Sequence, residues 1–277
     1  MPELPEVETT RRHLAPVLEG ARIVDVTLTR DRMARRNTRP VDVVDRLEGR
    51  LIGSVGRRGK FLLIDVEGDL TWVIHLGMSG RVRIAENPGE PRETHAHFTA
   101  TTDRGPQVRL IDPRTFGFVA VFTPDELATD SLSLLGPDAW EDLPKAPTLH
   151  SRLTDRRVPL KALLLDQREL AGLGNIYADE VLFRAGVRPD RVAGSVTSPE
   201  VDRLLDAIPV VLAAGIESGG TSLDDLAYLL PDGRAGEFLS QLAVYGRAGQ
   251  PCRRCGSAIE RVIVAQRSSH FCPRCQT

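Results

Sequence analysis

The chain changes its rhythm of apolar and polar positions near residue 130. Before that point, apolar and polar residues alternate in short runs separated by Gly, Asn and Pro, which is typical of antiparallel strands. These runs are RIVDVTL (22–28), LIGSVGRRGKFLLIDV (51–66), LTWVIHLGMSGRVRI (70–84), HFTATT (97–102) and VRLIDPRTFGFVAVF (108–122). From Leu160 apolar residues recur at helical spacing, and the longest such run is VDRLLDAIPVVLAAGIES (201–218). The pattern predicts an α+β protein with an antiparallel sandwich or barrel followed by helices.

The first residues, MPELPEVETTRRHL, have two interpretations. Proline in a first helical turn and the acidic side chains Glu3, Glu6 and Glu8 near the positive end of a helix dipole are typical of a helix start. The chemical interpretation starts from Met1, which we expect to be removed before the small residue Pro2. A terminal secondary amine titrates near pH 8, so a useful fraction is neutral and nucleophilic at cell pH. These residues alone leave both interpretations open, a helix start and a nucleophilic terminal amine.

All four cysteines lie in the last 26 residues, as two Cys-x2-Cys pairs separated by sixteen residues. They are Cys252, Cys255, Cys272 and Cys275. This spacing predicts one structural zinc ion per chain, because four thiolates leave no coordination position open. The alternative, two disulfides, is disfavoured in a cytosolic protein. The intervening IERVIVAQRSSHF predicts a hairpin with its turn near Gln266 and Arg267.

Composition and charge place the chain in a broad class. Its 277 residues are 41% apolar and 27% charged, without a long apolar run or a signal-peptide start, so we expect a soluble cytosolic protein with no membrane partner. The net charge of -2 is unevenly distributed along the chain. After residue 246 there are six arginines and a single acidic residue, Glu260, so the C-terminal end is basic. That end indicates a polyanionic partner. A phosphate-contacting arginine and a solubilising one remain alternatives for Arg267.

Three internal segments carry candidate chemistry. In GRRGKFLL, Lys60 is one of only three lysines. A nucleotide-binding loop would require glycine at the position of Ser54 and serine or threonine at that of Phe61, so this segment is not such a loop. In LLLDQRELAGLGNIYADE, a glycine-bearing turn followed by Asn175 as a helix N-cap fits either a phosphate grip or an ordinary helical hairpin. The segments HLGMSG and DPRTFG place Met78, Arg114 and Phe116 in turns, although Met and Phe usually belong to a core.

Together these segments resemble one family, the bacterial formamidopyrimidine-DNA glycosylases. The matching motifs are PELPEVET, GRRGK, HLGMSG, DPRTFG, LLLDQ with AGLGNIYADE, VYGRAG and the CxxC pairs ending in CPRCQ. The resemblance implies an N-terminal β-sandwich, a helical domain with a helix, two turns, helix element, and a C-terminal zinc-finger hairpin. We expect residues 1–130 to form the catalytic sandwich with its N-terminal helix, 131–150 the linker, 151–242 the helical DNA-binding domain and 243–277 the zinc finger.

The resemblance also implies an activity. The chain is expected to excise 8-oxoguanine and formamidopyrimidines from double-stranded DNA through a Schiff base and to cleave the strand by β,δ-elimination. It would act on oxidised bases and abasic sites as a monomer in the bacterial cytoplasm, associated with the nucleoid when on DNA. No redox cofactor or catalytic metal is required.

Residue roles follow from the same motifs. Pro2 matches the nucleophile and Glu3 the acid/base partner, while Lys60 and Arg267 match residues near the lesion phosphate. The remaining matches are DNA contacts. They are His75, Asn175 and Tyr245 on phosphates, the trio Met78, Arg114 and Phe116 in the gap left by the everted nucleotide, and Lys161 with a less defined role; Glu6 also falls in a matching segment.

The segment GGTSLDDLAYLLPDGRAGEF matches the lesion-capping loop of the family, but Leu226 to Leu230 are unexpectedly apolar for that role. Two alternatives therefore stay open. One is an endonuclease VIII-like enzyme for oxidised pyrimidines, which typically begins PEG where this chain has PEL. The other is a non-catalytic zinc-ribbon protein that binds nucleic acid and needs no free Pro2.

Overall fold

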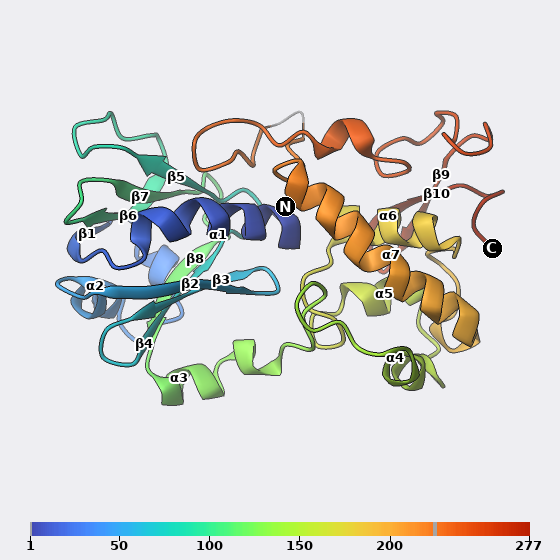
Figure 1. The fold of residues 1–277 in the computed structure, drawn as a ribbon, viewed down its shortest axis with the longest axis horizontal. Coiled ribbons are helices and arrows are strands. Elements are labelled where there is room, and N and C mark those ends of the chain that lie inside the picture. Colours follow the sequence, from blue (N-terminus) through green and yellow to red (C-terminus); the bar gives the residue numbers. More distant parts are fainter. Residues whose placement is uncertain (1, 224–225) are drawn as a thin grey trace. The chain divides into compact units, whose positions relative to one another are not determined.

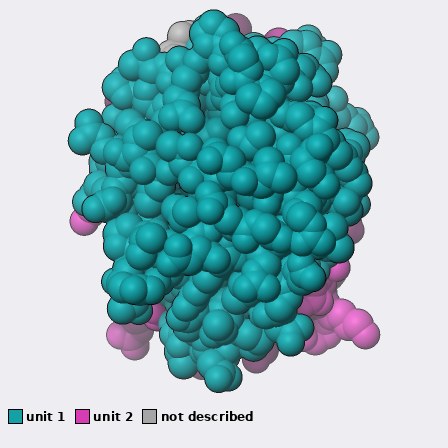
Figure 2. Space-filling model, turned by 90° about the vertical axis from the view of Figure 1, so that its left-hand side faces the viewer, with its two compact units in different colours: residues 1–134, 216–239 teal, residues 135–215, 240–277 magenta. Residues whose placement is uncertain are grey.

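The structure is a computed structural model that describes residues 2–223 and 226–277. The chain forms two compact units, coloured separately in Figure 2, and each consists of two stretches of sequence. The first unit holds residues 1–134 and 216–239, and the second holds residues 135–215 and 240–277. Across the described residues, no helix combines the length and apolar character needed to cross a bilayer.

Two four-stranded antiparallel sheets form the first unit, with strand orders β1-β6-β7-β5 and β2-β3-β4-β8 (Figure 1). The strands are β1 (Ile23–Leu28), β2 (Ile52–Arg58), β3 (Phe61–Val66), β4 (Leu70–His75), β5 (Arg81–Ala85), β6 (Ala96–Thr102), β7 (Gln107–Ile111) and β8 (Phe118–Phe122). In β3 the buried residues are Leu62, Ile64 and Val66, so every second side chain enters the core. The expected β-sandwich is confirmed, and each alternating run of the sequence supplies its strands.

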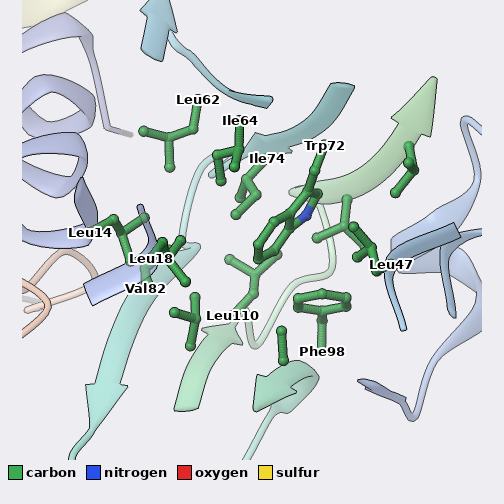
Figure 3. Close-up of a cluster of buried hydrophobic side chains, with 14 of the residues drawn as sticks. Leu14, Leu18, Leu47, Leu62, Ile64, Trp72, Ile74, Val82, Phe98 and Leu110 are labelled. Carbon is green, nitrogen blue, oxygen red and sulfur yellow. The ribbon is translucent and has the colours of Figure 1, made fainter. Parts of the chain in front are cut away.

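The core of this unit lies between the two sheets. Trp72 of β4 packs against Phe98 of β6 with ring centroids 5.5 Å apart, and both are fully buried (Figure 3). Leu14 and Leu18 join the same cluster from the N-terminal helix. The helix that carries the chain terminus is therefore fixed to the sandwich by apolar packing.

The helices of the first unit are short apart from the first. They are α1 (Leu4–Leu18), the 3-10 turn η1 (Asp31–Ala34), α2 (Val41–Leu47), α3 (Pro124–Thr129) and the 3-10 turn η2 (Ser131–Leu134). α3 lies at the end of the range expected to form the sandwich, where only the N-terminal helix was predicted. Thr123 caps it, because its hydroxyl accepts a hydrogen bond from the Glu126 amide while the Glu126 carboxylate accepts one from the Thr123 amide.

The second unit is helical and ends in a hairpin. Its helices are α4 (Ala146–Leu153), α5 (Leu160–Leu165), α6 (Asn175–Ala185), the 3-10 turn η3 (Ala193–Ser195) and α7 (Ser198–Glu217), and its strands are β9 (Glu260–Val264) and β10 (Arg267–Phe271). The turn η4 (Phe238–Gln241) lies where the chain passes back from the first unit to the second. The expected helix-two-turns-helix and zinc-finger hairpin are both present, which confirms the predicted fold class.

The stretch 216–239 belongs to the first unit, whereas the sequence-based division placed it in the helical domain. The Ile84 amide of β5 donates to the Pro231 carbonyl at 3.0 Å, and further contacts reach the first turn of α1. The residues 224–225 at the centre of the expected lesion-capping loop lie outside the described residues. The chain returns to the first unit at Ile216, just before the two glycines of the GGT element.

Candidate active site and nucleic-acid interface

Pro2 and Glu3 lie at the start of α1, and both are buried. Glu3 is the N-cap with an extended backbone, and Pro5 lies in the first turn, so the helix-start interpretation is confirmed. The expected removal of Met1 lies outside the described residues. A helix N-terminus carries partial positive charge, which favours the neutral form of an amine placed there. The helix-start interpretation thus supports the chemical one, because the same geometry keeps an N-terminal amine reactive.

Glu6 connects the first turn of α1 to a distant part of the chain. Its Oε2 accepts a 2.7 Å hydrogen bond from the Glu3 amide, and its Oε1 accepts another, also at 2.7 Å, from the Thr221 amide. Gly220 has φ +85, and a Cβ there would lie 2.9 Å from the Glu6 carboxylate. The buried Tyr228 hydroxyl lies 3.3 Å from the Glu6 carbonyl. This clamp fixes the position of Glu3, and it explains why the apolar stretch 226–230 is partly buried.

Lys60 lies in the turn between β2 and β3, and it is 8% exposed. The turn is held by Arg57, whose buried guanidinium donates to the Gly59 carbonyl at 3.0 Å and to the Glu8 carboxylate of α1 at 3.3 Å. Burial alone would raise the pKa of Glu8, but hydrogen bonds from Arg11 and other arginines hold that pKa below its usual range. A charged network therefore connects the lysine turn to the helix that carries Pro2.

His75 ends β4, where its backbone pairs with Phe61. Burial lowers the pKa of His75 to about 4, and the positive charges of Lys60 and Arg35 lower it further. The Gly77 amide donates to its Nδ1 at 3.2 Å. His75 is therefore a neutral imidazole at pH 7, with Nε2 carrying the proton, so a phosphate contact there would be a hydrogen bond without full charge.

Two loops of the sandwich are held together by one buried carboxylate, that of Asp112. Its oxygens accept hydrogen bonds from the Ser79 hydroxyl at 2.6 Å, the Gly117 amide at 2.7 Å and the Arg114 amide at 3.2 Å. The Arg114 Nε donates to the Ser79 hydroxyl at 3.1 Å. The segments HLGMSG and DPRTFG therefore meet, as the resemblance requires.

Met78 and Phe116 are presented to solvent by these loops. Met78 is 40% exposed and Phe116 is 43% exposed, although side chains of this kind usually lie in the core. The Arg114 guanidinium lies 5.6 Å from the centre of the Phe116 ring. The structure thus brings all three side chains to one pair of loops in the first unit, and it excludes the core interpretation for Met78 and Phe116.

In the second unit, Asn175 is the first residue of α6, and Gly174 is the N-cap; the expected N-cap role of Asn175 is wrong. Gly174 takes the cap position because its backbone is extended, while Gln167 organises the preceding turn by accepting from the Gly172 amide at 2.9 Å. The Asn175 amide group donates to the Ser268 carbonyl at 3.1 Å. Its Oδ1 is buried and has no hydrogen-bond partner among the described residues.

Lys161 was expected to contact DNA, and the structure corrects this expectation. The side chain is fully buried, with Nζ 2.7 Å from the Asp179 carboxylate and hydrogen-bonded to the Ser268 carbonyl and the Ser269 hydroxyl at 3.0 and 2.9 Å. A buried ammonium with a carboxylate partner has no surface left for a phosphate. Lys161 instead fixes the zinc-finger hairpin at the residue after Arg267.

The two acids of α6 hold the C-terminal part of the second unit. Asp179 also accepts from the His270 amide at 2.8 Å, and Glu180 accepts from the amides of Ala243, Val244 and Tyr245 at 2.8 to 2.9 Å. Burial raises the pKa of Glu180, although the three backbone donors oppose the rise. Glu180 thereby positions Tyr245, whose ring meets that of His270 at 5.2 Å.

Arg267 is exposed at the first position of β10, directly after the turn Ala265–Gln266. Both turn residues have positive φ, 47 and 60, as tight hairpins require. The sequence-based turn position was therefore one residue late. Arg267 nevertheless lies at the tip of the hairpin, free of the ion pairs found for the described residues.

The four cysteines form one cluster, and all are free thiols. Their Sγ atoms lie within 4.8 Å of one another, with 3.4 Å between Cys255 and Cys272 and 4.0 Å between Cys252 and Cys275. Zn–S bonds of about 2.3 Å in a tetrahedron place sulfurs roughly 3.8 Å apart. The cluster fits a structural zinc ion with four thiolate ligands, and the disulfide alternative is excluded.

Sequence reasoning missed the residues that position the site. Asp112, Arg57, Asp179 and Glu180 were not singled out. The two adjacent acids of NIYADE, in a helix that is otherwise apolar, were an available signal for buried carboxylates with fixed partners. Arg57 and Asp112 gave no such signal, because charged residues beside turns are ordinarily exposed.

Comparisons with known proteins agree with this arrangement. Three family models match, described as the formamidopyrimidine-DNA glycosylase N-terminal domain (residues 1–119), its H2TH domain (135–226) and the zinc finger found in FPG and IleRS (249–277). The formamidopyrimidine-DNA glycosylase of Heliobacterium modesticaldum is 46% identical over 279 residues, covering all of both chains. The enzyme of that name from Thermus thermophilus is 46% identical over all of this chain and 98% of its own.

Solved structures are similar over the whole chain. The crystal structure of the MutM (Fpg) protein from Thermus thermophilus has a TM-score of 0.88 at 43% identity, covering 99% of this chain and 98% of that one. Lactococcus lactis Fpg in complex with DNA containing an abasic site has a TM-score of 0.90 at 34% identity, with full coverage of both chains. A complex of MutM with DNA containing carbocyclic 8-oxo-G gives 0.90 at 35% identity, also with full coverage.

Proposed function

The chain belongs to the formamidopyrimidine-DNA glycosylase family, and from this premise we propose which residues carry out each step of its reaction. The enzyme excises oxidised purines, such as 8-oxoguanine and formamidopyrimidines, from DNA and cleaves the strand at the abasic site during base excision repair. The observation that carries the residue assignment is the buried start of α1, where Pro2 and Glu3 adjoin each other and are held by Glu6.

Base excision begins at Pro2. With Met1 removed, the neutral Pro2 nitrogen attacks C1′ of the damaged nucleotide, and the N-glycosidic electron pair leaves with the base. The Pro2 nitrogen then loses its N–H proton, which balances the proton taken up by the departing base. Glu3 delivers a proton to the sugar ring oxygen, so the ring opens and an iminium forms between C1′ and the Pro2 nitrogen. The Glu6 bond to the Glu3 backbone supports this role, because it fixes the carboxyl-bearing residue beside the nucleophile.

Strand cleavage follows from the charge of the iminium. A secondary amine gives an iminium that cannot lose its charge from nitrogen, so it withdraws electrons from the sugar. Loss of a proton from C2′ then expels the 3′ phosphate, and a second proton loss expels the 5′ phosphate. Hydrolysis of the iminium regenerates the amine. Every step uses groups of the chain and water.

The DNA backbone is bound by separate groups of the two units. In the first unit, Lys60 supplies a compact charge and His75 a neutral N–H donor. In the second unit, Asn175 presents a side-chain amide, Tyr245 a hydroxyl and Arg267 an exposed guanidinium. Lys161 takes part indirectly, by fixing the carbonyl beside Arg267. We thus propose a catalytic sandwich and a helical DNA-binding part with its zinc finger.

Met78, Arg114 and Phe116 fill the space vacated by the everted nucleotide, with Phe116 inserted between the remaining base pairs. Their exposure on loops fixed by Asp112 supports this role, since a wedge must be both solvent-accessible and held from behind. The zinc ion held by the four cysteines supplies no chemistry to the reaction. It binds the two Cys-x2-Cys turns together and thereby orients the hairpin that carries Arg267.

The site of action is the bacterial cytoplasm, where the nucleoid provides the substrate. Four free thiols arranged for zinc support a reducing compartment. The named relatives are bacterial enzymes, which agrees with this location.

Trapping of the covalent intermediate tests the assignment. With a duplex containing one 8-oxoguanine, borohydride is expected to reduce the iminium and attach the DNA to Pro2, as located by peptide mapping. Pro2→Gly keeps a primary amine and should retain some trapping, whereas protein that retains Met1 should give none. An adduct on Lys60, or full activity with Met1 attached, would overturn the role of Pro2 and leave the family assignment intact.

A further inference from the structure

Residues 30–39 form the densest run of positive charge in the first unit, and the function described above does not use it. Five of these ten residues are arginines, namely Arg30, Arg32, Arg35, Arg36 and Arg39. The run contains η1 and the turn that leads to α2. A solvated basic surface on a DNA-binding protein would account for the charge, but it would not account for where two of the guanidinium groups are bound.

Arg35 donates to two successive carbonyls of the wedge loop, the segment Arg114–Gly117. Its Nη2 lies 2.8 Å from the Phe116 oxygen, and its Nη1 lies 2.6 Å from the Gly117 oxygen. Arg32 extends the row, with Nε 3.3 Å from the Thr115 oxygen. Three consecutive carbonyls of the loop are therefore bound by guanidinium groups from one turn more than 80 residues earlier in the sequence.

The wedge loop requires such support. Thr115 has φ 54, a left-handed conformation that is unfavourable for a β-branched residue. Phe116 projects into solvent, so its side chain has little packing to hold the backbone in place. Asp112 binds the amide side of the loop through Gly117. Arg35 binds the carbonyl side of the same peptide segment, and the two groups together enclose the residue that must push into a base stack.

We propose that Arg35 is a positioning residue for the Phe116 wedge, holding the loop against the force of the stacked bases during nucleotide eversion. This inference rests on the proposed wedge role of Phe116. The planar fork of arginine holds two adjacent carbonyls through two N–H groups in a fixed geometry, which the single ammonium of a flexible lysine does not reproduce. Arg35 also packs over Phe118 at 5.3 Å, which fixes the orientation of the guanidinium plane.

A direct phosphate contact by Arg35 is the competing role, and it has a different signature. Loss of one phosphate contact lowers the slope of log Kd against log salt by about 0.9, and it weakens binding to paired and single-stranded DNA alike. Loss of wedge support leaves that slope unchanged. It slows excision only where base pairs must be opened, because a single strand has little stacking to overcome.

The experiment compares Arg35→Lys, Phe116→Ala and their combination in the full-length, zinc-loaded enzyme. Lysine keeps the positive charge, so a residue that only contacts phosphate would leave the duplex rate of Arg35→Lys unchanged, and that result would overturn the positioning role. Single-turnover excision of 8-oxoguanine is measured on a duplex and on the same single strand, together with the salt dependence of duplex binding. Arg39→Lys is the matched control, since Arg39 lies on the same run and pairs with Asp42 at 2.6 Å, away from the wedge loop.

We expect Arg35→Lys to slow duplex excision on the order of tenfold, equivalent to about 1.4 kcal/mol, with the single-strand rate and the salt slope unchanged. In the Phe116→Ala background the Arg35 change should have no further effect, because both act through the wedge. Equal slowing on both substrates, a reduced salt slope, or full additivity would overturn the role of Arg35. If Phe116→Ala alone leaves duplex excision unchanged, the wedge assignment fails, and the inference fails with it.

Discussion

The carboxylate of Asp179 lies 2.7 Å from the ammonium of Lys161, and neither side chain has any exposed surface. Removing one partner of a buried pair leaves the other charge without compensation, which typically costs about 3–5 kcal/mol. Asp179→Asn is therefore expected to lower the free energy of unfolding by about this amount, as measured by urea denaturation of zinc-loaded protein. The double variant Asp179→Asn, Lys161→Met should recover part of the loss. A double variant less stable than either single one would contradict the assignment of Lys161 as the charge that compensates Asp179.

Glu6 accepts from two backbone amides, and a glutamine in its place retains only one acceptor oxygen. Glu6→Gln would bring its NH2 group toward either the Glu3 or the Thr221 amide, which leaves a buried donor unsatisfied at about 1–3 kcal/mol. We expect lower thermal stability and slower base excision, because the start of α1 is displaced.

The matched control for this change is Glu19→Gln, at the other end of α1. Among the described residues, the Glu19 carboxylate accepts a hydrogen bond only from the Val55 amide, and the oxygen of glutamine can keep that bond. Equal effects of the two changes on excision would argue against a special role for the Glu6 clamp.

Metal loss should separate DNA binding from stability of the sandwich. Cys272→Ser, or treatment with a chelator, is expected to release the zinc ion and loosen the hairpin, so Arg267 no longer binds its phosphate. Metal analysis should give one zinc per native chain and less in the variant, while duplex binding weakens. The fluorescence of the buried Trp72, measured in a Trp140→Phe background because Trp140 lies in the second unit, should stay unchanged. A zinc-free preparation with full affinity for DNA would contradict this.

The half-buried imidazole of His75 predicts a dependence of stability on pH. Its folded pKa of about 4 is below the unfolded value near 6.5, so the unfolded chain binds the proton first as pH falls. The contribution is therefore fully present above pH 6.5 and is lost between pH 6.5 and 4, by at most about 1.4 kcal/mol per pH unit.

Two measurements check this. His75→Gln should flatten the pH dependence of the unfolding free energy in that window. Lys60→Gln should raise the His75 pKa seen by NMR, because the lysine charge is one cause of the depression. A His75 resonance that titrates near pH 6.5 in the native protein would refute the assigned environment.

The sequence predicted the parts of this protein that depend on local pattern. Period-two alternation located the strands, and the Cys-x2-Cys spacing located the zinc cluster. The helix α3 was missed although Thr123 and Glu126 form a capping box, because residues 124–129 directly follow the last strand and are too few to show a helical period. The Asn175 cap was misplaced by one residue because either Gly174 or Asn175 could end the turn.

The supporting contacts of the site could not be predicted from pattern. Thr221 reaches Glu6 across 215 residues, and Arg35 reaches Phe116 across 81. No periodicity or motif connects such pairs, since their proximity arises only when the sandwich has closed. The family resemblance led to a set of proposed DNA contacts, but for Lys161 it could not show that the side chain is buried beside Asp179.

The first compact unit begins with residue 1 and is complete only with residue 239. A ribosome therefore synthesises the N-terminal residues that carry the reactive amine well before the segment 216–239 that holds them in place. Until Thr221 has emerged, the Glu6 carboxylate lacks one of its two backbone donors, and the start of α1 is only partly fixed. Nascent chains and fragments truncated before residue 221 should consequently carry an exposed amine without the geometry for excision. Excision is therefore expected only from chains that extend beyond Thr221, although the reactive end leaves the ribosome first.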